Sequence, residues 1–465
     1  MIPLLTADET RRAEAAHSGP LDELMERAGR AAAELVLEQY PGSVTVVCGG
    51  GNNGGDGRVC ARILQEAKRE VTVVDGFGEL GEPEVIVDAL LGIGLHDAPR
   101  EDVARMIERV NAAGAPVVSI DVPSGVNAST GEIPGAAVRA DATVTFGAAK
   151  VGLVVAPGRF FSGRVYVADI GLELAGHEHV LVPASVLDLV PKKGPTSTKY
   201  RAGTVFVVGG SRGLTGAPML AALAAFRADA GYVAVAAPES ALPVLEARLL
   251  EAVKRPLPED GAGLVLPRAA ETVLGLSQAA NAVALGPGLG RSDGTRDFVR
   301  LVLEQLERPV VVDADALWEL EPFERAAPTV LTPHAGELAA LLGTSAAEVD
   351  AHRLEAVRRA ASLFGATVLL KGADTLVASP REGVLVAAYG APALATAGTG
   401  DVLAGIVAAF LAKGLDAPLA AAAAAVAHGL ASRLVEPQAG LVASDLLPGI
   451  QRALAGEGRE LSPLH

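Results

Sequence analysis

Residues 394–414 read LATAGTGDVLAGIVAAFLAKG and decide the fold of the C-terminal half of the chain. In this segment a Gly-Thr-Gly turn, residues 398–400, comes immediately before Asp401 and an apolar helix. The backbone N–H groups of such a turn can hold the negative charge of a phosphoryl group at the helix N-terminus. Asp401 is then placed to act as a base. The simpler alternative is that Asp401 only caps the helix.

Three further segments of this half place polar residues at the ends of predicted strands. VVVDADAL puts Asp313 and Asp315 at one strand end, LTPHAGEL puts His334 and Glu337 after another, and LLKGADTLV puts residues 371–375 in a strand-turn-strand. Because the carboxyl ends of parallel strands line the binding crevice of an open α/β sheet, we expect these groups to share one crevice. Two alternatives remain: Asp313 could serve only as a helix cap, and His334 only as a structural hydrogen-bonding residue.

The N-terminal half contains a second glycine-rich turn between a strand and a helix. Residues 44–64 read VTVVCGGGNNGGDGRVCARIL. Glycines let the backbone approach a ligand closely, and the helix N-terminus presents unpaired N–H groups to an anion. The segment matches neither G-x-G-x-x-G nor the P-loop pattern, so a tight structural turn is the alternative. Asn52, Asn53 and Asp56 favour a ligand, because a simple turn does not need their side chains.

Two more strand ends of the N-terminal half carry oxygen ligands. VIVDALLGIGL places Asp88 at the end of a buried strand, and VVSIDVPSGV places Asp121 and Ser124 at the end of another. One such Asp could be a cap, but several strand ends that deliver oxygen atoms converge on a site. A set of oxygen ligands suits a hard cation or a sugar.

The alternation of short apolar runs with longer polar or Ala-rich segments predicts an α/β protein with two domains, residues 1–190 and 191–465. Two helices are expected between Ala7 and Gln39. The rhythm breaks near residues 182–200, which contain prolines and paired lysines. Expected strands of the first domain, an open doubly wound sheet, are 44–48, 71–74, 85–88, 117–120 and 142–146. Those of the second are 204–208, 232–236, 282–285, 310–313, 330–331 and 368–370.

Composition and charge narrow the classes of function. The chain has 465 residues, 50% of them hydrophobic and only 3% aromatic, and a formal net charge of −16. A strongly acidic protein is a poor general binder of nucleic acids or anionic membranes. The N-terminus lacks the pattern of a secretory signal, and no apolar run is long enough to span a bilayer, so we expect a cytoplasmic protein. Cys48 and Cys60, the only cysteines, are expected to be buried thiols.

Four segments of the first half, GGGNNGGDG, DALLGIGL, IDVPSGV and ADATVTFGAAKVGL, resemble the NAD(P)H-hydrate epimerase family over about residues 1–175. The resemblance implies a Rossmann-like α/β/α domain with Asp121 as catalytic acid/base. Lys150 would orient the phosphate or carboxamide of the substrate, or would simply be solvated. The implied potassium ligands are Asn53, Asp88 and Ser124. The implied contacts to the hydrated dinucleotide are Asn52, Asn53, Gly54, Gly55, Asp56, Gly92, Ile93, Gly94, Leu95, His96, Asp97, Ala98 and Asp121.

The second half resembles the ADP/ATP-dependent NAD(P)H-hydrate dehydratase family over about residues 195–455. The segments that carry this resemblance are VVGGSRGLTGAPMLAALAA, ALGPGLG, TPHAGE, KGADT, ATAGTGDVLAG and GLVASDLL. It implies a ribokinase-like α/β fold and Mg²⁺ with ADP or ATP. Asp401 would be the base that promotes phosphorylation of the substrate. The implied substrate contacts are Ala217, Gly288, His334 and Asp401, and the implied nucleotide contacts are Lys371, Gly372, Ala373, Asp374, Thr375 and Gly400.

Together the resemblances imply an enzyme that repairs hydrated nicotinamide cofactors, NADHX and NADPHX. One domain would interconvert their R and S epimers, and the other would dehydrate the S epimer, with ADP converted to AMP and phosphate. Self-association into a homo-oligomer is expected from the apolar, Ala-rich composition. One alternative is a small-molecule kinase of the ribokinase or hydroxymethylpyrimidine type with a regulatory first domain. Another is a non-catalytic dinucleotide or nucleoside sensor.

Some positions depart from the family patterns. Arg58 follows the glycine-rich loop where an apolar residue is expected, and Ala391 stands where Asn is frequent. Thr198 lacks the His often found before the following lysine, and Ser432 stands in a segment that usually ends in an acidic residue. Because the last three border the nucleotide site or the domain junction, we expect them to affect nucleotide affinity and choice rather than the type of reaction.

Overall fold

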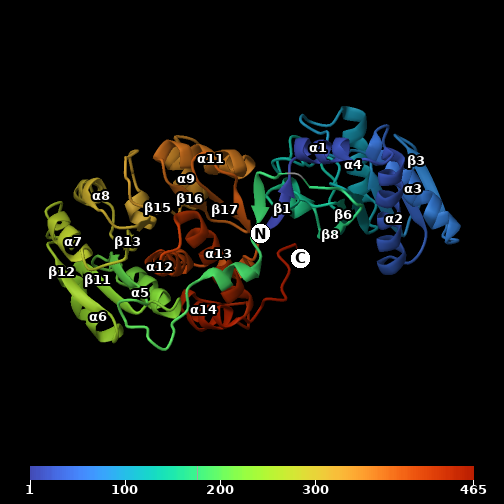
Figure 1. Ribbon diagram of the computed structural model, residues 1–465. Helices are drawn as coiled ribbons and strands as arrows, with labels where there is room; N and C mark the ends of the chain where they lie inside the picture. Colours follow the sequence, from blue (N-terminus) through green and yellow to red (C-terminus); the bar gives the residue numbers. More distant parts are fainter. Residues whose placement is uncertain (175, 465) are drawn as a thin grey trace. The chain divides into compact units, whose positions relative to one another are not determined.

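The computed structural model describes residues 1–174 and 176–464, which form two compact units (Figure 1). The N-terminal unit comprises residues 2–180 with 350–352, and the C-terminal unit comprises residues 181–349 and 353–463. The division lies before the boundary predicted at 190/191, because the 3-10 helix η3 (Ala184–Leu189) packs into the core of the C-terminal unit. Its residues Val186 and Leu187 are buried there.

The N-terminal unit is built on a six-stranded parallel sheet in the order β3-β2-β4-β5-β6-β8. Helices α2 (Leu21–Gln39) and α3 (Asn52–Glu66) cover one face, and α4 (Glu101–Ala112) covers the other. This arrangement confirms the predicted doubly wound α/β/α fold. The strands are β2 (Val44–Cys48), β3 (Val71–Asp75), β4 (Val85–Ala89), β5 (Val117–Ile120), β6 (Ala142–Phe146) and β8 (Arg164–Ala168).

A short N-terminal strand precedes the two expected helices. Strand β1 (Ile2–Leu5) pairs in parallel with β7 (Ala149–Lys150). Helix α1 (Ala7–Ala16) follows and starts with a capping box, in which Thr6 and Glu9 satisfy each other's backbone N–H groups. The pairing of β1 with β7 fixes the segment that carries Lys150.

The order of the sheet places a crevice at β2 and β4. The chain leaves β2 to form β3 on one side, and returns to form β4 on the other side of β2. In open α/β sheets, ligands bind outside the carboxyl ends of the strands at such a switch point. The glycine-rich loop after β2 and Asp88 at the end of β4 therefore lie at the expected binding edge.

The C-terminal unit contains a larger sheet, in the order β12-β11-β10-β13-β14-β15-β16-β17-β18. The first seven strands are parallel, whereas β17 and β18 are antiparallel additions. The strands are β10 (Thr204–Val208), β11 (Tyr232–Pro238), β12 (Val253–Leu257), β13 (Ala282–Leu285), β14 (Val310–Val312), β15 (Thr329–Leu331), β16 (Thr367–Leu370), β17 (Thr375–Ala378) and β18 (Leu385–Ala387).

Four helices pack together against this sheet in one hydrophobic core: α5 (Gly216–Arg227), α12 (Thr399–Ala412), α13 (Ala417–Arg433) and α14 (Leu446–Ala455). Their small side chains allow close contact. A Cβ atom added to Gly405 of α12 would lie 2.2 Å from the carbonyl oxygen of Ala221 in α5. The remaining helices are α6 (Leu242–Arg248), α7 (Ala269–Ser277), α8 (Asp293–Gln305), α9 (Ala335–Leu342), α10 (Ala346–Ala351) and α11 (Arg353–Phe364).

Both cysteines are free and buried, as predicted. Burial raises the pKa of the Cys48 thiol to about 11 and that of Cys60 to about 12. In the described part of the chain, no helix combines the length and apolar character that crossing a bilayer requires.

Candidate active sites

The N-terminal unit contains a cavity of about 420 Å³ at the carboxyl edge of its sheet. Helices α1, α2 and α3 form part of its wall, and residues at or after the ends of β5, β6, β7 and β8 form the rest. Apolar and ionisable groups alternate around it, as expected for a pocket that takes a large polar molecule. The lining residues are Thr10, Arg11, Glu14, Ala15, Leu21, Asp22, Leu24, Met25, Ala28, Asn52, Asp56, Asp121, Phe146, Lys150, Ile170 and Leu172.

Asp121 and Lys150 form a buried ion pair in this cavity. The Nζ atom of Lys150 lies 2.6 Å from Oδ1 of Asp121, and the side chain of Lys150 is 0% exposed. Thr145 donates a hydrogen bond to the same carboxylate oxygen at 3.0 Å. The alternative that Lys150 is solvated is therefore wrong. Asp121 has a φ of 64°, in the left-handed region that non-glycine residues rarely occupy. Such local strain is frequent at functional sites.

Two more carboxyl groups face the same cavity. Asp56 lies in the second turn of α3, and Glu14 lies near the end of α1. Burial, together with the neighbouring carboxylates of Asp121 and Glu14, raises the pKa of Asp56 to about 8. Burial and Asp121 also raise the pKa of Glu14. Asp56 belongs to a sequence motif, whereas nothing in the sequence around Glu14 distinguishes it from an ordinary exposed helical residue.

Asn53, Asp88 and Ser124 meet around the backbone of Leu91. The Asn53 side-chain amide donates to the carbonyl oxygen of Leu91 at 2.9 Å, and the Leu91 N–H donates to Oγ of Ser124 at 2.8 Å. Ser124 in turn donates to Asp88 at 2.6 Å. The fully buried Asp88 also accepts bonds from the Ser119 hydroxyl and the Ser124 N–H. The structure thus brings these three predicted residues together, with several oxygen atoms at one place.

Close backbone contacts explain why two positions in and after the loop that follows β2 must be glycine. A Cβ atom at Gly54 would lie 2.0 Å from the carbonyl oxygen of Gly49, and one at Gly49 would lie equally close to that of Leu90. Of the predicted 92–98 segment, Gly92 lies against Asn53. Residues 96–98 are exposed, and none of 92–98 lines the cavity described above.

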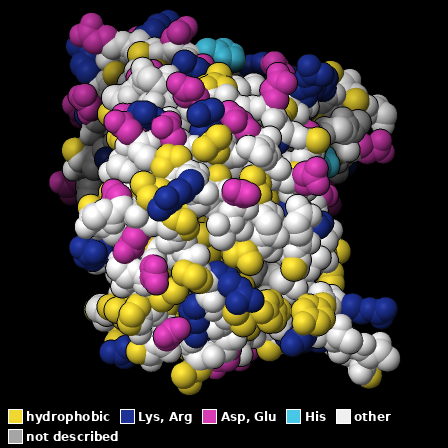
Figure 2. Space-filling model, turned by 90° about the vertical axis from the view of Figure 1, so that its left-hand side faces the viewer, with side chains coloured by type: hydrophobic (Ala, Val, Ile, Leu, Met, Phe, Trp, Pro, Cys, Tyr) yellow, Lys and Arg dark blue, Asp and Glu magenta, His cyan; other side chains and the backbone are white. Residues whose placement is uncertain are grey.

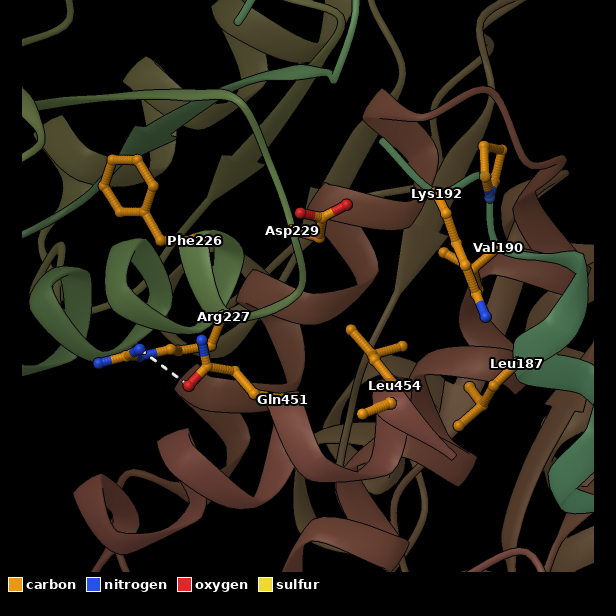
Figure 3. Close-up of a pocket in the computed structure, with 10 residues that line it drawn as sticks. Leu187, Val190, Lys192, Phe226, Arg227, Asp229, Gln451 and Leu454 are labelled. Atoms are coloured by element: carbon orange, nitrogen blue, oxygen red, sulfur yellow. Dashed lines mark hydrogen bonds between the residues drawn. The ribbon is translucent and has the colours of Figure 1, made fainter. Parts of the chain in front are cut away.

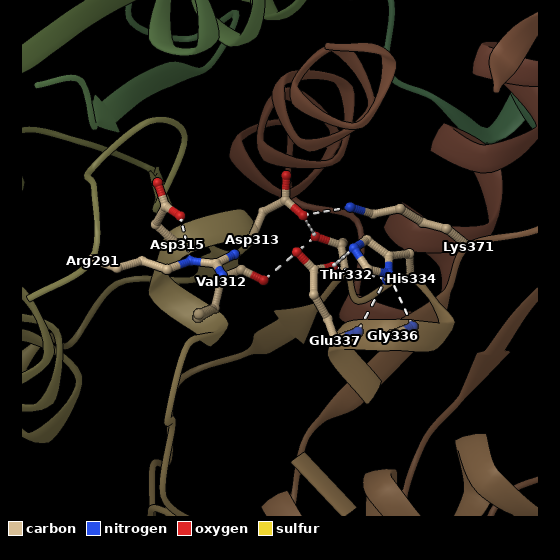
Figure 4. A network of polar contacts seen from close by, with 9 residues as sticks. All are labelled: Arg291, Val312, Asp313, Asp315, Thr332, His334, Gly336, Glu337 and Lys371. Carbon is tan, nitrogen blue, oxygen red and sulfur yellow. Dashed lines mark hydrogen bonds and ion pairs between the residues drawn. The ribbon is translucent and has the colours of Figure 1, made fainter. Parts of the chain in front are cut away.

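In the C-terminal unit, Lys371 joins two strand ends (Figure 4). Its Nζ atom lies 2.7 Å from Oδ1 of Asp313, which also accepts a hydrogen bond from the Thr332 hydroxyl at 2.7 Å. Burial opposes the charge of Lys371, but the carboxylates of Asp313, Glu337 and Asp401 outweigh it and raise the pKa of the lysine. Asp313 makes no side-chain cap to the following 3-10 helix. The helix-cap alternative for Asp313 is therefore wrong.

Asp401 lies in the first turn of α12, close to this lysine. The N-cap residue is Gly398, with a φ of 89° in the left-handed region, and the helix has no side-chain cap. Asp401 is thus not the N-cap. A Cβ atom added to Gly400 would lie 3.1 Å from Nζ of Lys371, so the ammonium group lies at the turn. Burial and the carboxylate of Asp313 raise the pKa of Asp401 to about 7.

His334 is the N-cap of α9. Its Nδ1 atom accepts hydrogen bonds from the N–H groups of Gly336 and Glu337, which confirms a structural role for this residue (Figure 4). Its side chain is nevertheless 60% exposed, with Nε2 at 3.6 Å from the carboxylate of Glu337. His334 and Glu337 also line a cavity of about 540 Å³ together with Arg291 and Trp318. The capping bonds thus hold the ring at the edge of an open space.

The predicted nucleotide-binding turn has one member whose side chain points elsewhere. Residues 371–374 form the connection between β16 and β17, and Thr375 begins β17, which confirms the predicted strand-turn-strand. The carboxylate of Asp374 is 1% exposed and pairs with Arg353 at 3.2 Å. Arg353 also donates to the carbonyl oxygen of Lys371, and the Thr375 hydroxyl donates to that of Gly372. Asp374 therefore stabilises the turn through Arg353. The sequence motif does not indicate that Arg353 is its partner.

Two predicted substrate contacts lie side by side. A Cβ atom at Gly288, which has a φ of 68°, would lie 3.2 Å from Cβ of Ala217. Gly398 lies against Leu220 of the same helix, α5, so the start of this helix adjoins the turn before Asp401. The predicted substrate contacts Ala217, Gly288 and Asp401 thus come from α5, from the loop after β13 and from α12.

The four residues that depart from the family patterns, Arg58, Thr198, Ala391 and Ser432, lie outside the cavities described above. Arg58 is exposed and pairs with Asp75 at 2.6 Å, and Thr198 is exposed. Ala391 precedes the 3-10 helix η6, and the Ser432 hydroxyl donates to the carbonyl oxygen of Gly429 at 2.7 Å.

Another cavity of about 360 Å³ lies in the C-terminal unit near the end of α5 (Figure 3). There Arg227 donates to Gln451 of α14 at 2.9 Å. None of the predicted site residues lines this cavity. Because α5 starts at the carboxyl edge of the sheet and ends toward the start of β11, this cavity belongs to the opposite edge.

Comparison with protein-family models gives a match for each half of the chain. Residues 205–452 match the model described as NAD(P)H-hydrate dehydratase. Residues 21–80 and 74–152 match the model described as YjeF-related protein N-terminus.

Curated proteins match over almost the whole chain. The bifunctional NAD(P)H-hydrate repair enzyme Nnr of Salinibacter ruber is 38% identical, over 98% of this chain and 97% of that protein. The enzyme of the same name from Escherichia coli is 35% identical, over 97% of this chain and 94% of that protein.

Solved structures match the C-terminal unit. The ADP/ATP-dependent NAD(P)H-hydrate dehydratase from Bacillus subtilis, co-crystallised with ATP and Mg²⁺, has a TM-score of 0.53 and 29% identity, and the match covers 58% of this chain and 95% of that chain. A ribokinase-like superfamily protein from Enterococcus faecalis has a TM-score of 0.52 and 22% identity, with coverage of 61% and 98%. The second likeness is one of fold alone, and it confirms the predicted ribokinase-like fold.

Proposed function

Because this chain belongs to the family of bifunctional NAD(P)H-hydrate repair enzymes, we propose that it restores hydrated nicotinamide cofactors with one active site in each unit. The observation that carries the proposal is that each unit presents a carboxylate at the ligand-binding edge of its own sheet. Asp121 lies there in the N-terminal unit and Asp401 in the C-terminal unit. Asp121 pairs with Lys150, and Asp401 lies near Lys371. Because the two carboxylates belong to different units, the two reactions can be separated by substitution.

In the N-terminal cavity, the R and S epimers of NADHX and NADPHX interconvert. The loop after β2 and the start of α3, residues 49–56, bind the phosphates and ribose through backbone N–H groups. The C6 carbon of the substrate carries a hydroxyl group and the ring nitrogen, and its configuration changes when one of these bonds opens and re-forms. Asp121, held by Lys150 and Thr145, exchanges the proton that this requires.

In the C-terminal crevice, the S epimer loses water with consumption of a nucleotide. Asp401 takes the proton of the C6 hydroxyl while the hydroxyl oxygen attacks the terminal phosphorus of the nucleotide. The turn at Gly398–Gly400 and the ammonium group of Lys371 stabilise the negative charge of the transferred group. Phosphate then leaves with the C6–O electron pair, and loss of a proton from C5 restores the dihydropyridine. Ala217, Gly288 and His334 contact the substrate.

The phosphoryl donor is ADP or ATP, and ADP, converted to AMP and phosphate, is the donor we favour. Lys371 to Thr375 and Gly400 contact the nucleotide. Mg²⁺ bound with the nucleotide would neutralise part of the phosphate charge. Asp313, Glu337 and Asp401 are the carboxylates that act on the lysine that faces the phosphates.

We assign a potassium ion to the group formed by Asn53, Asp88 and Ser124. The Leu91 carbonyl, the Ser124 hydroxyl and the Asp88 carboxylate supply oxygen atoms at this place, a set that suits a hard monovalent or divalent cation, and the Asn53 side chain reaches the Leu91 carbonyl through its amide nitrogen. Asp88 already accepts four hydrogen bonds, so its main contribution is to orient Ser124 and to supply negative charge.

The partners of the protein are small molecules. The net charge of −16 disfavours polyanions. On the face drawn in Figure 2, the acidic and basic side chains are interspersed, and the described residues there form no continuous basic field. We propose a cytoplasmic protein that binds neither nucleic acid nor membranes, and a homo-oligomer in solution.

The decisive test follows the near-ultraviolet absorbance of NADH after the protein and Mg²⁺ are added to a mixed-epimer NADHX preparation, with ADP and ATP tried separately. Recovery of NADH beyond the S fraction would support both activities and identify the nucleotide. A stable phosphorylated product would support the small-molecule kinase, and saturable binding without turnover would support the sensor.

A further inference from the structure

Lys150 has no proton to offer to a substrate. An ammonium group has three N–H donors. Those of Lys150 point to Oδ1 of Asp121 at 2.6 Å, to Oγ1 of Thr145 at 3.0 Å and to the carbonyl oxygen of Phe146 at 2.9 Å. The side chain is fully buried. Lys150 therefore positions Asp121, and any group that gives a proton to the substrate must be found elsewhere in the N-terminal cavity.

The reaction assigned to this cavity needs such a group. This need for an acid rests on the proposed epimerase function. If the ring opens, a base removes the proton of the C6 hydroxyl, the C6–N1 bond breaks, and C6 becomes an aldehyde. The nitrogen keeps the bonding pair and must receive a proton. Rotation about C5–C6 exposes the other face of the aldehyde, and ring closure reverses both transfers. One acid and one base are therefore required.

Besides Asp121 and Lys150, only two of the polar residues that line the cavity remain as candidates for the acid. Asn52 also lines the cavity, but its amide does not exchange protons. Arg11 is exposed and pairs with Asp8 at 2.6 Å, and the Thr10 hydroxyl donates to the backbone of Thr6. Asp22 is exposed to solvent. The two carboxyl groups that remain, on Glu14 of α1 and Asp56 of α3, are both partly buried. Within the described residues, neither has an ion-pair or side-chain hydrogen-bond partner.

Position and charge favour Asp56 over Glu14. Asp56 lies in the second turn of α3, the helix that follows the glycine-rich loop expected to hold the dinucleotide. The groups that face it are Asp121, Glu14 and Lys150, and the net effect of burial and these charges raises the pKa of Asp56 to about 8. The carboxyl group therefore carries a proton at neutral pH, whereas Asp121 lies in an ion pair.

We propose that Asp56 is the general acid of the N-terminal site, giving a proton to the ring nitrogen while Asp121 takes the proton of the C6 hydroxyl. In the reverse direction Asp56 removes the nitrogen proton and Asp121 returns the hydroxyl proton, so both groups end each turnover as they began. Two carboxyl groups in different protonation states can thus serve opposite roles in one pocket.

The test uses the full chain with Asp401→Asn, which silences dehydration, and measures conversion of purified R-NADHX to the S epimer by chromatography. Asp56→Asn keeps the size of the side chain but removes the proton. We expect it to lower kcat by about 100-fold or more, with KM changed by less than about threefold. Glu14→Gln, the matched change in the same cavity, is expected to lower kcat by less than about fivefold.

The pH profile separates a catalytic role from a structural one. The epimerisation rate should fall as pH rises through about 8, because the acid form of Asp56 is lost. The residual rate of Asp56→Asn should lack this fall, and Asp56→Glu should recover at least about tenfold of the lost rate. Near-normal activity of Asp56→Asn, or a larger loss from Glu14→Gln, would overturn the assignment. Absence of epimerisation in the parent chain would instead contradict the proposed function.

Discussion

The ammonium group of Lys371 lies 2.7 Å from the carboxylate of Asp313, and this pair links the end of β14 to the end of β16. Asp313 is 2% exposed, so removal of its partner leaves a buried charge that keeps the hydrogen bond from the Thr332 hydroxyl. Lys371→Met is expected to destabilise the C-terminal unit by about 3 kcal/mol. Asp313→Asn added to Lys371→Met should recover at least half of the loss. Urea unfolding followed by the fluorescence of Trp318, the only tryptophan, measures both; simply additive losses would contradict the pairing.

Dehydration should depend on pH through Asp401. A general base works in its deprotonated form, and the pKa of Asp401 is raised to about 7. With saturating nucleotide and the S epimer, kcat/KM should therefore rise as pH increases through about 7 and level off above it. The profile is measured between about pH 5.5 and pH 9. A rate that is flat or falls over this range would show that Asp401 is not the base.

The two activities should be separable by single substitutions. Asp401→Asn is expected to lower NADH formation from the S epimer by about 1,000-fold and to leave R-to-S conversion intact. Asp121→Asn should do the reverse, because each carboxylate belongs to its own unit. Chromatography of the epimers and NADH absorbance report the two reactions in parallel. Loss of both activities from either change, in a chain that retains its fold, would refute two independent sites.

Potassium should support epimerisation specifically. Ser124→Ala removes a hydroxyl that bonds both Asp88 and the Leu91 backbone, and we expect the potassium concentration for half-maximal rate to rise by about tenfold or more. Thr45→Val is a matched control. Thr45 lies in β2 of the same sheet, and its hydroxyl donates to the carbonyl oxygen of Leu80, which is not part of the assigned ion site. If sodium replaces potassium without effect, or if both variants respond equally, the assigned ion site is wrong.

Close packing of α5 against α12 should make Gly405 intolerant of a larger residue. The methyl group of Gly405→Ala would lie 2.2 Å from the Ala221 carbonyl oxygen, so the helices must separate, at a cost of about 2 kcal/mol. Gly275→Ala in α7 is the control, because nothing lies within 4 Å of the added atom. It should be neutral or stabilise by about 0.5 kcal/mol. Equal effects of the two changes in urea unfolding would contradict this packing.

Most of the strands that could be predicted from the sequence are buried on both faces, and β3, an edge strand with mostly exposed residues, is an exception. Val44–Cys48 forms β2 with the predicted bounds, because a continuous apolar run is what a central parallel strand requires. The edge strands β8 and β12 were missed. The segment VKRPL of β12 carries two charges and a proline, which only an edge position tolerates. Strands β1 and β7 are too short for any local pattern to reveal them.

The candidate sites were predictable as far as motifs extend, but not the contacts that orient them. Asp121 and Lys150 are 29 positions apart, and only the fold brings the lysine into the cavity. Asp374 lies within a predicted nucleotide-binding turn, yet its carboxylate pairs with Arg353 on α11. Which side chain faces a ligand and which supports its neighbours depends on such tertiary partners, and no spacing along the chain encodes them.

Burial of both cysteines makes the wild-type chain a convenient background for labelling. A thiol with a pKa of about 11 has only about one molecule in 10,000 in the reactive thiolate form at neutral pH, and steric protection slows the reaction further. Maleimide dyes will therefore modify a cysteine introduced on the surface well before Cys48 or Cys60. Fluorophore pairs can be attached to introduced cysteines in the two units without first replacing either native cysteine.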